Sequence, residues 1–377
     1  MTRYTIREVQ TKKDLRRFIK FPFELYKGCD QYVPPLIKGQ EQELMYAASL
    51  KYCTRRMWLA EDEKGKVVGR ICAMINPRYN EKYGTKRARF GWFDLINDMD
   101  VAKLLFDAAE SWAKGEGMDE IHGPLYYNTL GRQGMLVEGF DRLSTMALIY
   151  NHPYYPEHMV KHGYAKETGW VEYRITLPDQ LSEKHLRVAE YITERYGLKV
   201  VKKTKREINR ERYGQKLFQL INETYCVLYG YSLLSEKQID QFVDVYLGVI
   251  DTEMLTFIED ANGELIGAGI TMPSIAKALQ KCNGEIIPFG WYHLLKTMYW
   301  KKPDTLELLL IGVKPEWQNK GVNSLVFVDL LKRLRRMGFK YAETNANLET
   351  NTKVQAMWAS FEKEQHKKRW VFGKEIE

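Results

Sequence analysis

The sequence predicts a mixed α/β fold (helices on mixed β sheets) built from two copies of one unit. At 377 residues the chain exceeds the usual size of a single domain. Each half contains a hairpin followed by a strand, a helix and another strand, in the same order. Between them, residues 178–184 (PDQLSEK) have the polar, proline-marked composition of a linker. We therefore expect two domains, residues 1–180 and 181–377.

The elements of the first half follow from hydrophobic periodicity and turn residues. Helix 100–117 carries its apolar side chains on one face, with Asp100 as the expected N-cap. The expected order is strand 4–9, helix 12–26, hairpin 57–76, strand 88–96, helix 100–117, strand 119–127, a long loop, and a helix, turn and strand over 156–177.

The second half repeats this order with little sequence identity to the first. Its hairpin turns at an Ala-Asn-Gly sequence, a common signal for a tight turn. The expected order is strand 198–203, helices 212–230 and 235–247, hairpin 253–272, strand 305–313, helix 322–338, strand 340–346, helix 351–365 and strand 368–376.

Charge and cysteine content narrow the classes of function. A net charge of +8 permits anionic partners without specifying one. The Lys and Arg clusters at 202–206 and 367–369 are short, which is more typical of solvated faces than of a nucleic-acid surface. The five cysteines are scattered, and no HExxH motif or carboxylate cluster is present, so we expect reduced thiols and no metal.

The beginning of the chain and its apolar runs indicate a compartment. Residues 1–18 lack the apolar core of a secretory signal, and no apolar run approaches the length of a transmembrane segment. We expect a cytoplasmic protein.

A strand-turn-helix junction at residues 313–327 (VKPEWQNKGVNSLVF) is the strongest candidate for a binding site. A helix N-terminus presents unpaired N–H groups and favours anions, and a glycine in the turn lets a phosphate approach the backbone. The turn supplies Gly321, the cation of Lys320 and the cap-type side chains of Asn323 and Ser324.

The junction, in its element order, resembles the GNAT superfamily of acyl-CoA-dependent N-acyltransferases. The family signature is Gln/Arg-x-x-Gly-x-Gly/Ala; the sequence matches it at Gln318 and Gly321 and departs from it at Asn323. The whole chain also resembles a bacterial family of tandem GNAT-like proteins. The resemblance implies two tandem GNAT-like domains and acetyl-CoA, or another acyl-CoA, as co-substrate. It implies cofactor binding by Ile311, Val313, Gln318, Asn319, Lys320, Gly321, Val322, Asn323 and Ser324.

The resemblance also suggests residues for the chemistry. The family often places a glutamate base on the strand before the loop, where this sequence has Glu307; a surface ion pair is an equal alternative for that residue. The usual acid is a tyrosine seven residues after an asparagine, but Trp358 stands seven residues after Asn351. Tyr341 and the tyrosines of the long loop are the candidate substitutes.

The first half is expected to be a degenerate copy that binds no cofactor. Its equivalent junction has no glycine and carries Asp94, Asp98 and Asp100, which would repel a pyrophosphate. The long loop 123–158 interleaves aromatic and polar residues, and we expect it to face the substrate across from Glu307. The predicted substrate-binding residues are Tyr126, Tyr127, Asn128, Arg132, Asn151 and Tyr154.

Three functions remain open from the sequence. The first is transfer of an acyl group, with acetyl expected, to a small-molecule or peptide amine. The second is aminoacyl transfer from charged tRNA, and the third is a non-catalytic acyl-CoA-binding module. The insertion 274–300, rich in aromatic and basic residues, is core, a lid over an acyl chain, or a membrane-surface helix. The oligomeric state is left open.

Overall fold

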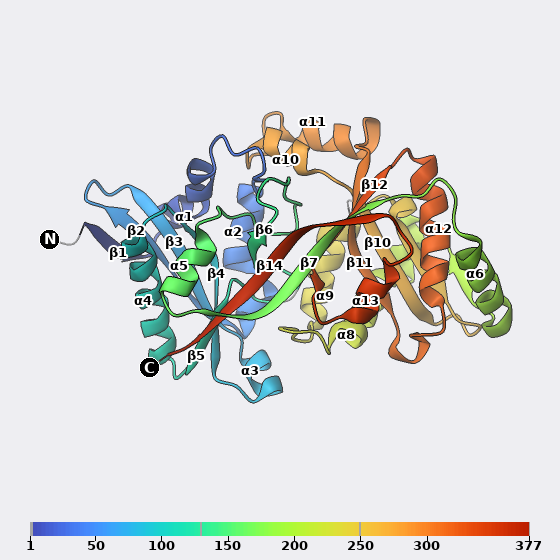
Figure 1. The fold of residues 1–377 in the computed structure, drawn as a ribbon, viewed down its shortest axis with the longest axis horizontal. Helices are drawn as coiled ribbons and strands as arrows, with labels where there is room; N and C mark the ends of the chain where they lie inside the picture. Colours follow the sequence, from blue (N-terminus) through green and yellow to red (C-terminus); the bar gives the residue numbers. More distant parts are fainter. Residues whose placement is uncertain (1–2, 129, 249, 377) are drawn as a thin grey trace. The chain divides into compact units, whose positions relative to one another are not determined.

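The computed structural model describes residues 3–128, 130–248 and 250–376, and these fold into two compact units (Figure 1). Unit 1 comprises Met1–Val171, Ile275–Leu295 and His366–Glu377, and unit 2 comprises Glu172–Ser274 and Lys296–Gln365. Unit 1 thus includes two segments from the second half of the chain, so its boundaries differ from a single division at residue 180.

Unit 1 is a sheet with helices on both faces. Its strands follow the order β1-β2-β3-β4-β5-β14-β7, with β6 also paired to β14. The strands are β1 (Tyr4–Glu8), β2 (Thr54–Asp62), β3 (Val67–Ile75), β4 (Arg87–Leu95), β5 (Glu120–Gly123), β6 (Met135–Glu138), β7 (Ala165–Thr176) and β14 (Lys363–Glu375). The helices are α1 (Lys12–Leu25), α2 (Ile37–Tyr46), α3 (Pro77–Tyr83), α4 (Met99–Gly115), α5 (Tyr155–Lys161), α10 (Ala276–Cys282) and α11 (Gly290–Leu295), with a 3₁₀ turn at Ala48–Lys51.

Two hydrophobic cores cover the two faces of this sheet. On one face, α4 packs its apolar stripe, including Leu105 and Phe106, on Ile71 and Phe90. On the other face, α1 packs Phe18 and its neighbours on the side chains of alternate strand residues. The predicted hairpin 57–76 is confirmed as the antiparallel pair β2–β3.

Unit 2 repeats the arrangement. Its strands follow the order β7-β12-β11-β10-β9-β8. The strands beyond β7 are β8 (Lys199–Val201), β9 (Leu255–Glu259), β10 (Leu265–Pro273), β11 (Thr305–Val313), β12 (Tyr341–Thr344) and β13 (Asn347–Leu348). The helices are α6 (Glu183–Tyr196), α7 (Lys205–Arg210), α8 (Tyr213–Tyr225), α9 (Glu236–Phe242), α12 (Val322–Arg336) and α13 (Thr352–Met357), with short π or 3₁₀ turns at Val243–Leu247, Thr252–Met254, Lys296–Trp300 and Pro315–Trp317.

Glycines in unit 2 let its central helix approach the sheet closely. A Cβ on Gly269 of β10 would lie 2.9 Å from Val326 of α12, and a Cβ on Gly267 would lie 3.3 Å from Val322. On the opposite face, Gly312 of β11 faces α8, because its Cβ would lie 3.3 Å from Ile221. The central strands of unit 2 are therefore held between α12 and α8.

A bulge in the fourth strand is common to the two units. In unit 1, Arg70 pairs with Asp94 and Cys72 with Gly91, so two β4 residues oppose the single residue Ile71. In unit 2, Ile270 pairs with Leu310 and Thr271 with Leu308, which leaves one extra residue on β11. Because a bulge bends its strand, each fourth strand diverges from the parallel strand beside it. The parallel pairs of β4 with β5 end at Arg89, and those of β11 with β12 end at Leu308.

Two expectations of the sequence are wrong in detail. The N-cap of α4 is Asp98, whose side chain accepts a hydrogen bond from the backbone N–H of Asp100. The expected helix 351–365 ends at Met357, and residues from Lys363 onward belong to β14. The polar sequence there is compatible with a helix, but backbone pairing to distant strands overrides that local preference.

The ends of the two halves are exchanged between the units. The last residues of β7, from the first half of the chain, pair in unit 2, with Arg174 opposite Glu343 of β12. The last residues of the chain, in β14, pair in unit 1, with Phe372 opposite Gly123 of β5. Phe372 is buried in the core beneath α4. Unit 1 therefore depends on the C-terminus of the chain.

We predict that Phe372→Ala destabilises unit 1 by about 3–5 kcal/mol, because it empties a buried aromatic site. Hydrogen–deuterium exchange should become faster in peptides from β4 and β5 while β10 and β11 keep their protection. Glu375→Ala, at an exposed position of the same strand, is the matched control. Faster exchange confined to unit 2 would contradict the assignment of β14.

Candidate functional site

Four consecutive apolar residues of β11 in unit 2 are partly exposed. β11 is a central strand, yet its residues Leu308, Leu309, Leu310 and Ile311 are only partly buried. Beyond Leu308, the parallel pairing with β12 has ended. The bulge thus leaves a strip of apolar side chains and backbone accessible within an otherwise packed sheet.

Two backbone carbonyls of these β11 residues already accept hydrogen bonds from neighbouring elements. Asn345, just after β12, donates from its backbone N–H to the carbonyl of Leu308 at 3.2 Å. The Tyr225 hydroxyl of α8 donates to the carbonyl of Ile311 at 3.0 Å. Burial raises the pKa of Tyr225 to about 12, so this hydroxyl remains a donor at neutral pH. A ligand amide that paired with this carbonyl would compete with Tyr225.

The chain passes from β11 through one short turn to the N-terminus of α12. Gly321 is the N-cap residue, with φ +86°, and no side chain caps the helix. Asn319 also has a positive φ of 61°, and Gln318 donates its side-chain amide to the carbonyl of Val313 at 3.2 Å. Lys320 is exposed, with its ammonium 4.7 Å from the ring centre of Trp317. This end of α12 therefore combines uncapped backbone N–H groups with a nearby cation.

Gly321 is required by packing as well as by backbone conformation. A Cβ at this position would lie 2.7 Å from Val188 of α6, and few residues other than glycine adopt its φ. A substitution of Gly321 would therefore disturb α6 whether or not a ligand binds here. Lys320 is the better position for a test.

Glu307, the predicted base, is buried in β11. Its carboxylate accepts a hydrogen bond of 2.9 Å from Ser274. In the sheet register it lies beside Glu343 of β12, which in turn lies beside Arg174 of β7. Paired residues on neighbouring strands share a face, so these charged side chains form one row across unit 2. Arg174 lies 3.4 Å from the Glu343 carboxylate.

Tyr341, the predicted acid, begins β12 and is partly exposed. The guanidinium of Arg174 lies 4.2 Å from its ring centre. Glu343 lies two residues further along the same strand and thus on the same face. Tyr341 and Glu307 therefore contribute to the same charged part of the sheet.

The corresponding helix end in unit 1 is closed by its own side chains. Asp98 accepts from the backbone N–H of Asp100 at 2.9 Å and from the Tyr4 hydroxyl at 2.8 Å. A carboxylate thus occupies the positive end of α4, where it complements the helix dipole. This arrangement disfavours a phosphate and distinguishes α4 from α12.

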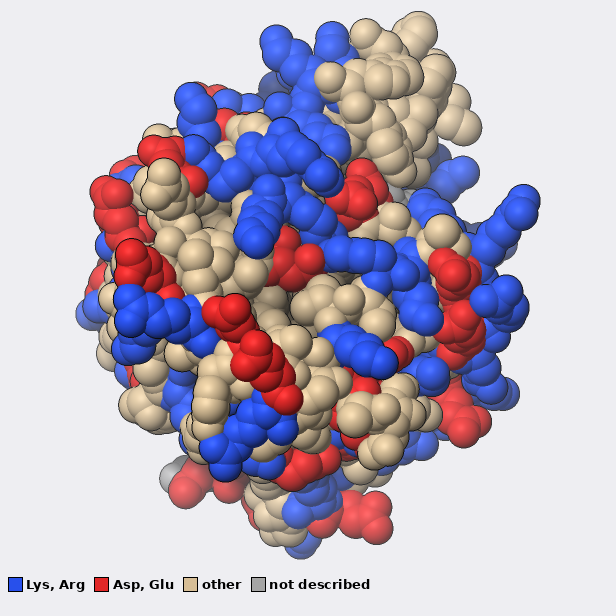
Figure 2. Space-filling view, turned by 90° about the vertical axis from the view of Figure 1, so that its right-hand side faces the viewer, with Lys and Arg blue, Asp and Glu red and all other residues tan. Residues whose placement is uncertain are grey.

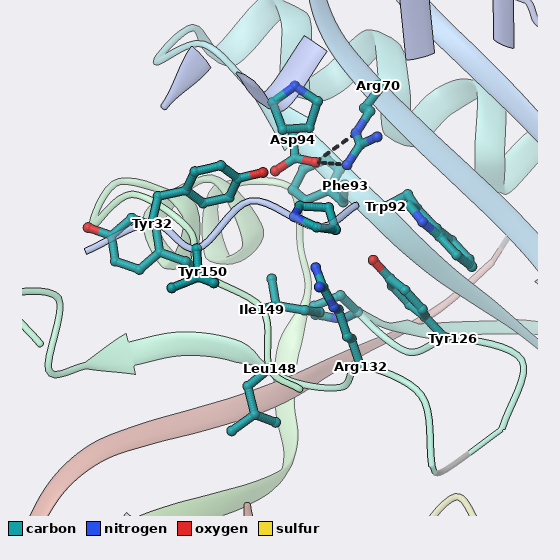
Figure 3. Close-up of a pocket in the computed structure, with 14 residues that line it drawn as sticks. Tyr32, Arg70, Trp92, Phe93, Asp94, Tyr126, Arg132, Leu148, Ile149 and Tyr150 are labelled. Atoms are coloured by element: carbon teal, nitrogen blue, oxygen red, sulfur yellow. Dashed lines mark hydrogen bonds and ion pairs between the residues drawn. The ribbon is translucent and has the colours of Figure 1, made fainter. Parts of the chain in front are cut away.

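Unit 1 contains a different feature, a pocket where β4 diverges from the chain after β5 (Figure 3). Its cavity volume is about 30 Å³, so it is small in the structure as it stands. Most of its wall is aromatic or apolar. The lining residues are Pro22, Tyr32, Val33, Pro35, Arg70, Trp92, Phe93, Asp94, Pro124, Tyr126, Arg132, Leu148, Ile149 and Tyr150.

A buried ion pair forms the polar part of the pocket wall. Arg70 donates to Asp94 at 2.7 Å, and the Tyr26 hydroxyl donates to the other Asp94 oxygen at 2.8 Å. Both members of the pair are almost fully buried. Figure 3 shows the Asp94 carboxylate between Arg70 and the aromatic side of the pocket. The charges of Arg70 and Asp94 therefore compensate each other within the wall.

Trp92, in the bulge of β4, is held in an unusual backbone conformation. Its φ is +45°, which costs free energy for a residue other than glycine. Its ring stacks on Tyr126 with 3.6 Å between ring centres, and its indole N–H donates to Gln40 at 2.8 Å. These contacts fix the bulge, and with it the pocket wall.

The structure brings two of the six predicted loop residues, Tyr126 and Arg132, to this pocket. The others lie elsewhere in unit 1. Asn128 accepts from backbone N–H groups of its own turn, Asn151 pairs with the backbone of Leu136, and Tyr154 donates to the carbonyl of Leu95. The Tyr127 ring is buried in the core beneath α1.

Sequence reasoning missed the ion pair that the pocket contains. Arg70 interrupts the apolar strand VVGRICAMI, and a charge at an interior strand position was the available signal. Asp94 was grouped with the aspartates at the helix start, but it belongs to β4 and is buried. Only the fold shows that these two residues meet.

Glu43 of α2 is linked to the pocket wall through Gln40. The Gln40 amide accepts from Trp92 and donates to Glu43 at 3.1 Å. Burial raises the pKa of Glu43 to about 7, although Arg132 and Gln40 act in the opposite direction. Glu43 is therefore partly protonated near neutral pH.

Comparison with known proteins identifies the fold. No family model matches the sequence. The chain is 28% identical over 379 residues to Protein YghO of Escherichia coli (strain K12), covering 98% of this chain and 95% of that protein. It is 26% identical over 356 residues to a protein of Caulobacter vibrioides (strain NA1000 / CB15N) named bacterial ceramide synthase, covering 91% and 90%.

Among solved structures, a tandem GNAT protein from the clavulanic acid biosynthesis pathway aligns over 99% of both chains, with a TM-score of 0.57 and 12% identity. The chain therefore has the tandem GNAT fold, as the sequence predicted. Among the residues that the structure describes, no helix combines the length and apolar character needed to cross a membrane. The same residues contain no group of three or more His, Cys, Asp or Glu side chains arranged to hold a metal ion.

We predict that Glu43 makes the protein less stable as pH rises. Its pKa in the folded protein, about 7, lies above the usual value of 4.5, so the folded state binds the proton more tightly. The resulting stabilisation is present below about pH 4.5 and is lost as pH rises to about 7. Thermal unfolding of Glu43→Gln should lack this loss, whereas Glu41→Gln, an exposed neighbour on α2, should retain it. Parallel pH profiles for wild type and Glu43→Gln would contradict the shift.

Proposed function

We propose that this protein is an acyl-CoA-dependent N-acyltransferase. The observation that carries the proposal is that the partly exposed strand residues Leu308–Ile311 are followed, after one turn, by the uncapped N-terminus of α12 at Gly321. A partly exposed apolar strand next to an anion-favouring helix terminus fits a molecule with an acylated arm and a pyrophosphate. The tandem GNAT fold supports the same reading.

The residues of unit 2 have distinct roles in this proposal. Backbone N–H groups of Val322 and Asn323 would hold the pyrophosphate, with Lys320 as a nearby cation. The bound thioester would supply an activated acyl carbonyl. Glu307, oriented by Ser274, would accept a proton from the attacking amine, because only the neutral amine is nucleophilic. Tyr341 would donate a proton to the leaving sulfur.

We further propose that the acceptor is a long-chain amine. One relative is named bacterial ceramide synthase, and a ceramide is the amide of a long-chain amino alcohol. The unit 1 pocket, with its apolar wall and the polar groups of Tyr126 and Arg132, is the proposed binding place for part of the acceptor. Burial raises the pKa of Tyr126, so its hydroxyl stays protonated and can donate.

We predict that coenzyme A binds with a stoichiometry of one per chain, because Asp98 closes the equivalent helix end in unit 1. Lys320→Glu should weaken binding roughly tenfold, since it places a like charge beside the phosphates. Isothermal titration calorimetry measures both quantities. Lys332→Glu makes the same charge change at an exposed position of α12 away from its N-terminus, and it should bind as wild type does. Two equivalent sites, or unchanged affinity in Lys320→Glu, would refute this assignment.

The transfer itself is tested by release of free coenzyme A from acyl-CoA in the presence of an amine. Dodecylamine should give a higher kcat/KM than butylamine. Glu307→Gln should lower kcat roughly a hundredfold at neutral pH, in line with the usual loss on removing a general base. Asp304→Asn, at an exposed residue just before β11, serves as the control. No amine-dependent release from any acyl-CoA would reject the proposed activity.

The coenzyme A release assay also tests whether the unit 1 pocket binds the acceptor. Tyr126→Phe keeps the ring that stacks on Trp92 and removes only the hydroxyl, so it should raise KM for the amine while coenzyme A affinity holds. If the change appears only in coenzyme A affinity, the pocket serves the donor instead.

A further inference from the structure

The insertion between β10 and β11 contains a concentrated set of exposed apolar side chains. Six of the seventeen large hydrophobic side chains that are exposed among the described residues lie within residues 286–295 of unit 1. Ile287 is 69% exposed and Phe289 is 72% exposed, values unusual for such residues. Single exposed apolar residues need no explanation, but a cluster of this kind marks an interaction surface. We call residues 286–295 the apolar tip.

The apolar tip is held firmly by the segment before it. In α10, Ala278, Leu279 and Cys282 are buried. Gln280 donates to the carbonyls of Asp30 and Tyr32 at 2.8 and 3.0 Å. These contacts anchor α10 to unit 1.

The turn after α10 is anchored as well. The backbone N–H of Ile37 donates to the carbonyl of Gly284 at 2.8 Å. Gly284 has a φ of +84°, and a Cβ there would lie 2.4 Å from the ring of Phe23. Because residue 284 is a glycine, the turn before the tip can pack closely on α1. The apolar side chains of the tip are therefore exposed although the segment before them is anchored to unit 1.

Positive charge accompanies the tip. Residues 274–302 contain five lysines and one glutamate, Glu285. Lys277 and Lys281 are exposed on α10, directly before the tip. Figure 2 shows an uncharged knob projecting at the top of the view, at the height of α11 in Figure 1.

We propose that the apolar tip inserts into the surface of an anionic lipid bilayer. Aromatic and aliphatic side chains at the headgroup boundary, flanked by lysines that attract anionic lipids, are the composition that favours such binding. A second protein surface fits less well, because lysine is depleted from protein interfaces. The tip therefore docks the protein on a membrane without crossing it.

This docking would bring lipid close to the unit 1 pocket. The backbone of Tyr32, which Gln280 holds, belongs to the segment that supplies Tyr32, Val33 and Pro35 to the pocket wall. The anchored base of the tip and the pocket thus share one segment of unit 1. The identity of the acceptor rests on the proposed function. If the acceptor is a long-chain amine, the protein can take it from the bilayer near the unit 1 pocket. Docking of the tip on the bilayer does not require acyl transfer.

Vesicle flotation tests the docking directly with the full chain. Wild type should bind vesicles of phosphatidylcholine containing about one-third phosphatidylglycerol and bind pure phosphatidylcholine more weakly, as lysine attraction requires. The double variant Phe289→Ser/Trp291→Ser should lose at least roughly tenfold in affinity, because it removes two apolar side chains from the boundary. Its thermal unfolding should match that of wild type, since both residues are exposed.

Matched variants separate apolar insertion from general effects. Val160→Ser/Tyr83→Ser removes two exposed apolar side chains elsewhere in unit 1 and should bind as wild type does. Lys277→Glu/Lys281→Glu should weaken binding to anionic vesicles roughly tenfold and leave binding to neutral vesicles unchanged. Hydrogen–deuterium exchange should show protection of residues 284–295 on addition of vesicles.

Two results would overturn the proposal. Vesicle binding that is absent in wild type, or equal in Phe289→Ser/Trp291→Ser, would show that the tip does not dock on lipid. Concentration-dependent dimerisation that the same double variant abolishes, without vesicle binding, would assign the tip to a second copy of the chain. Neither result depends on whether the protein transfers acyl groups, so failure here is distinct from failure of the proposed activity.

Discussion

The extra residue in the fourth strand of each unit is the constraint on which both candidate sites depend. A bulge bends its strand and interrupts regular pairing, so the parallel neighbour cannot follow beyond a few residues. In unit 2 the regular parallel pairing ends at Leu308, and in unit 1 it ends at Arg89. In unit 2 the residues around the bulge of β11 are partly exposed, whereas in unit 1 the residues around the bulge of β4 stay buried and form a pocket wall.

The two units use the resulting space differently because their side chains differ. In unit 1, Trp92 and Tyr126 stack in the opening, and Arg70 and Asp94 neutralise each other in its wall. In unit 2, the aliphatic residues Leu308–Ile311 of β11 are partly exposed, and the following helix α12 begins at Gly321 with no side-chain cap. One fold thus provides an aromatic pocket in one copy and a partly exposed strand beside an anion-favouring helix end in the other.

The exchanged strands make the two halves of the sequence interdependent. Unit 1 buries Phe372 and accepts Arg369 from the end of the chain, where Arg369 is fully buried. Unit 2 takes the last residues of β7 from the first half. Each unit therefore reaches its full set of strands only when the other half of the chain is present.

The sequence alone determined the features that depend on local patterns. Alternation along the strands, the amphipathic stripe of α4, the two hairpins and the glycine turn before α12 are all encoded within short stretches. The tertiary structure decided what arises between distant residues: the pairing of Arg70 with Asp94, the bulge at Trp92, the strand formed by residues from Lys363 onward, and the exchange of β7 and β14. Asp98 replaced Asp100 as the N-cap because the cap depends on where β4 ends.

Non-local pairing and packing outweigh local preference at these places. Each of them involves backbone hydrogen bonds or buried charges whose partners lie tens to hundreds of residues away.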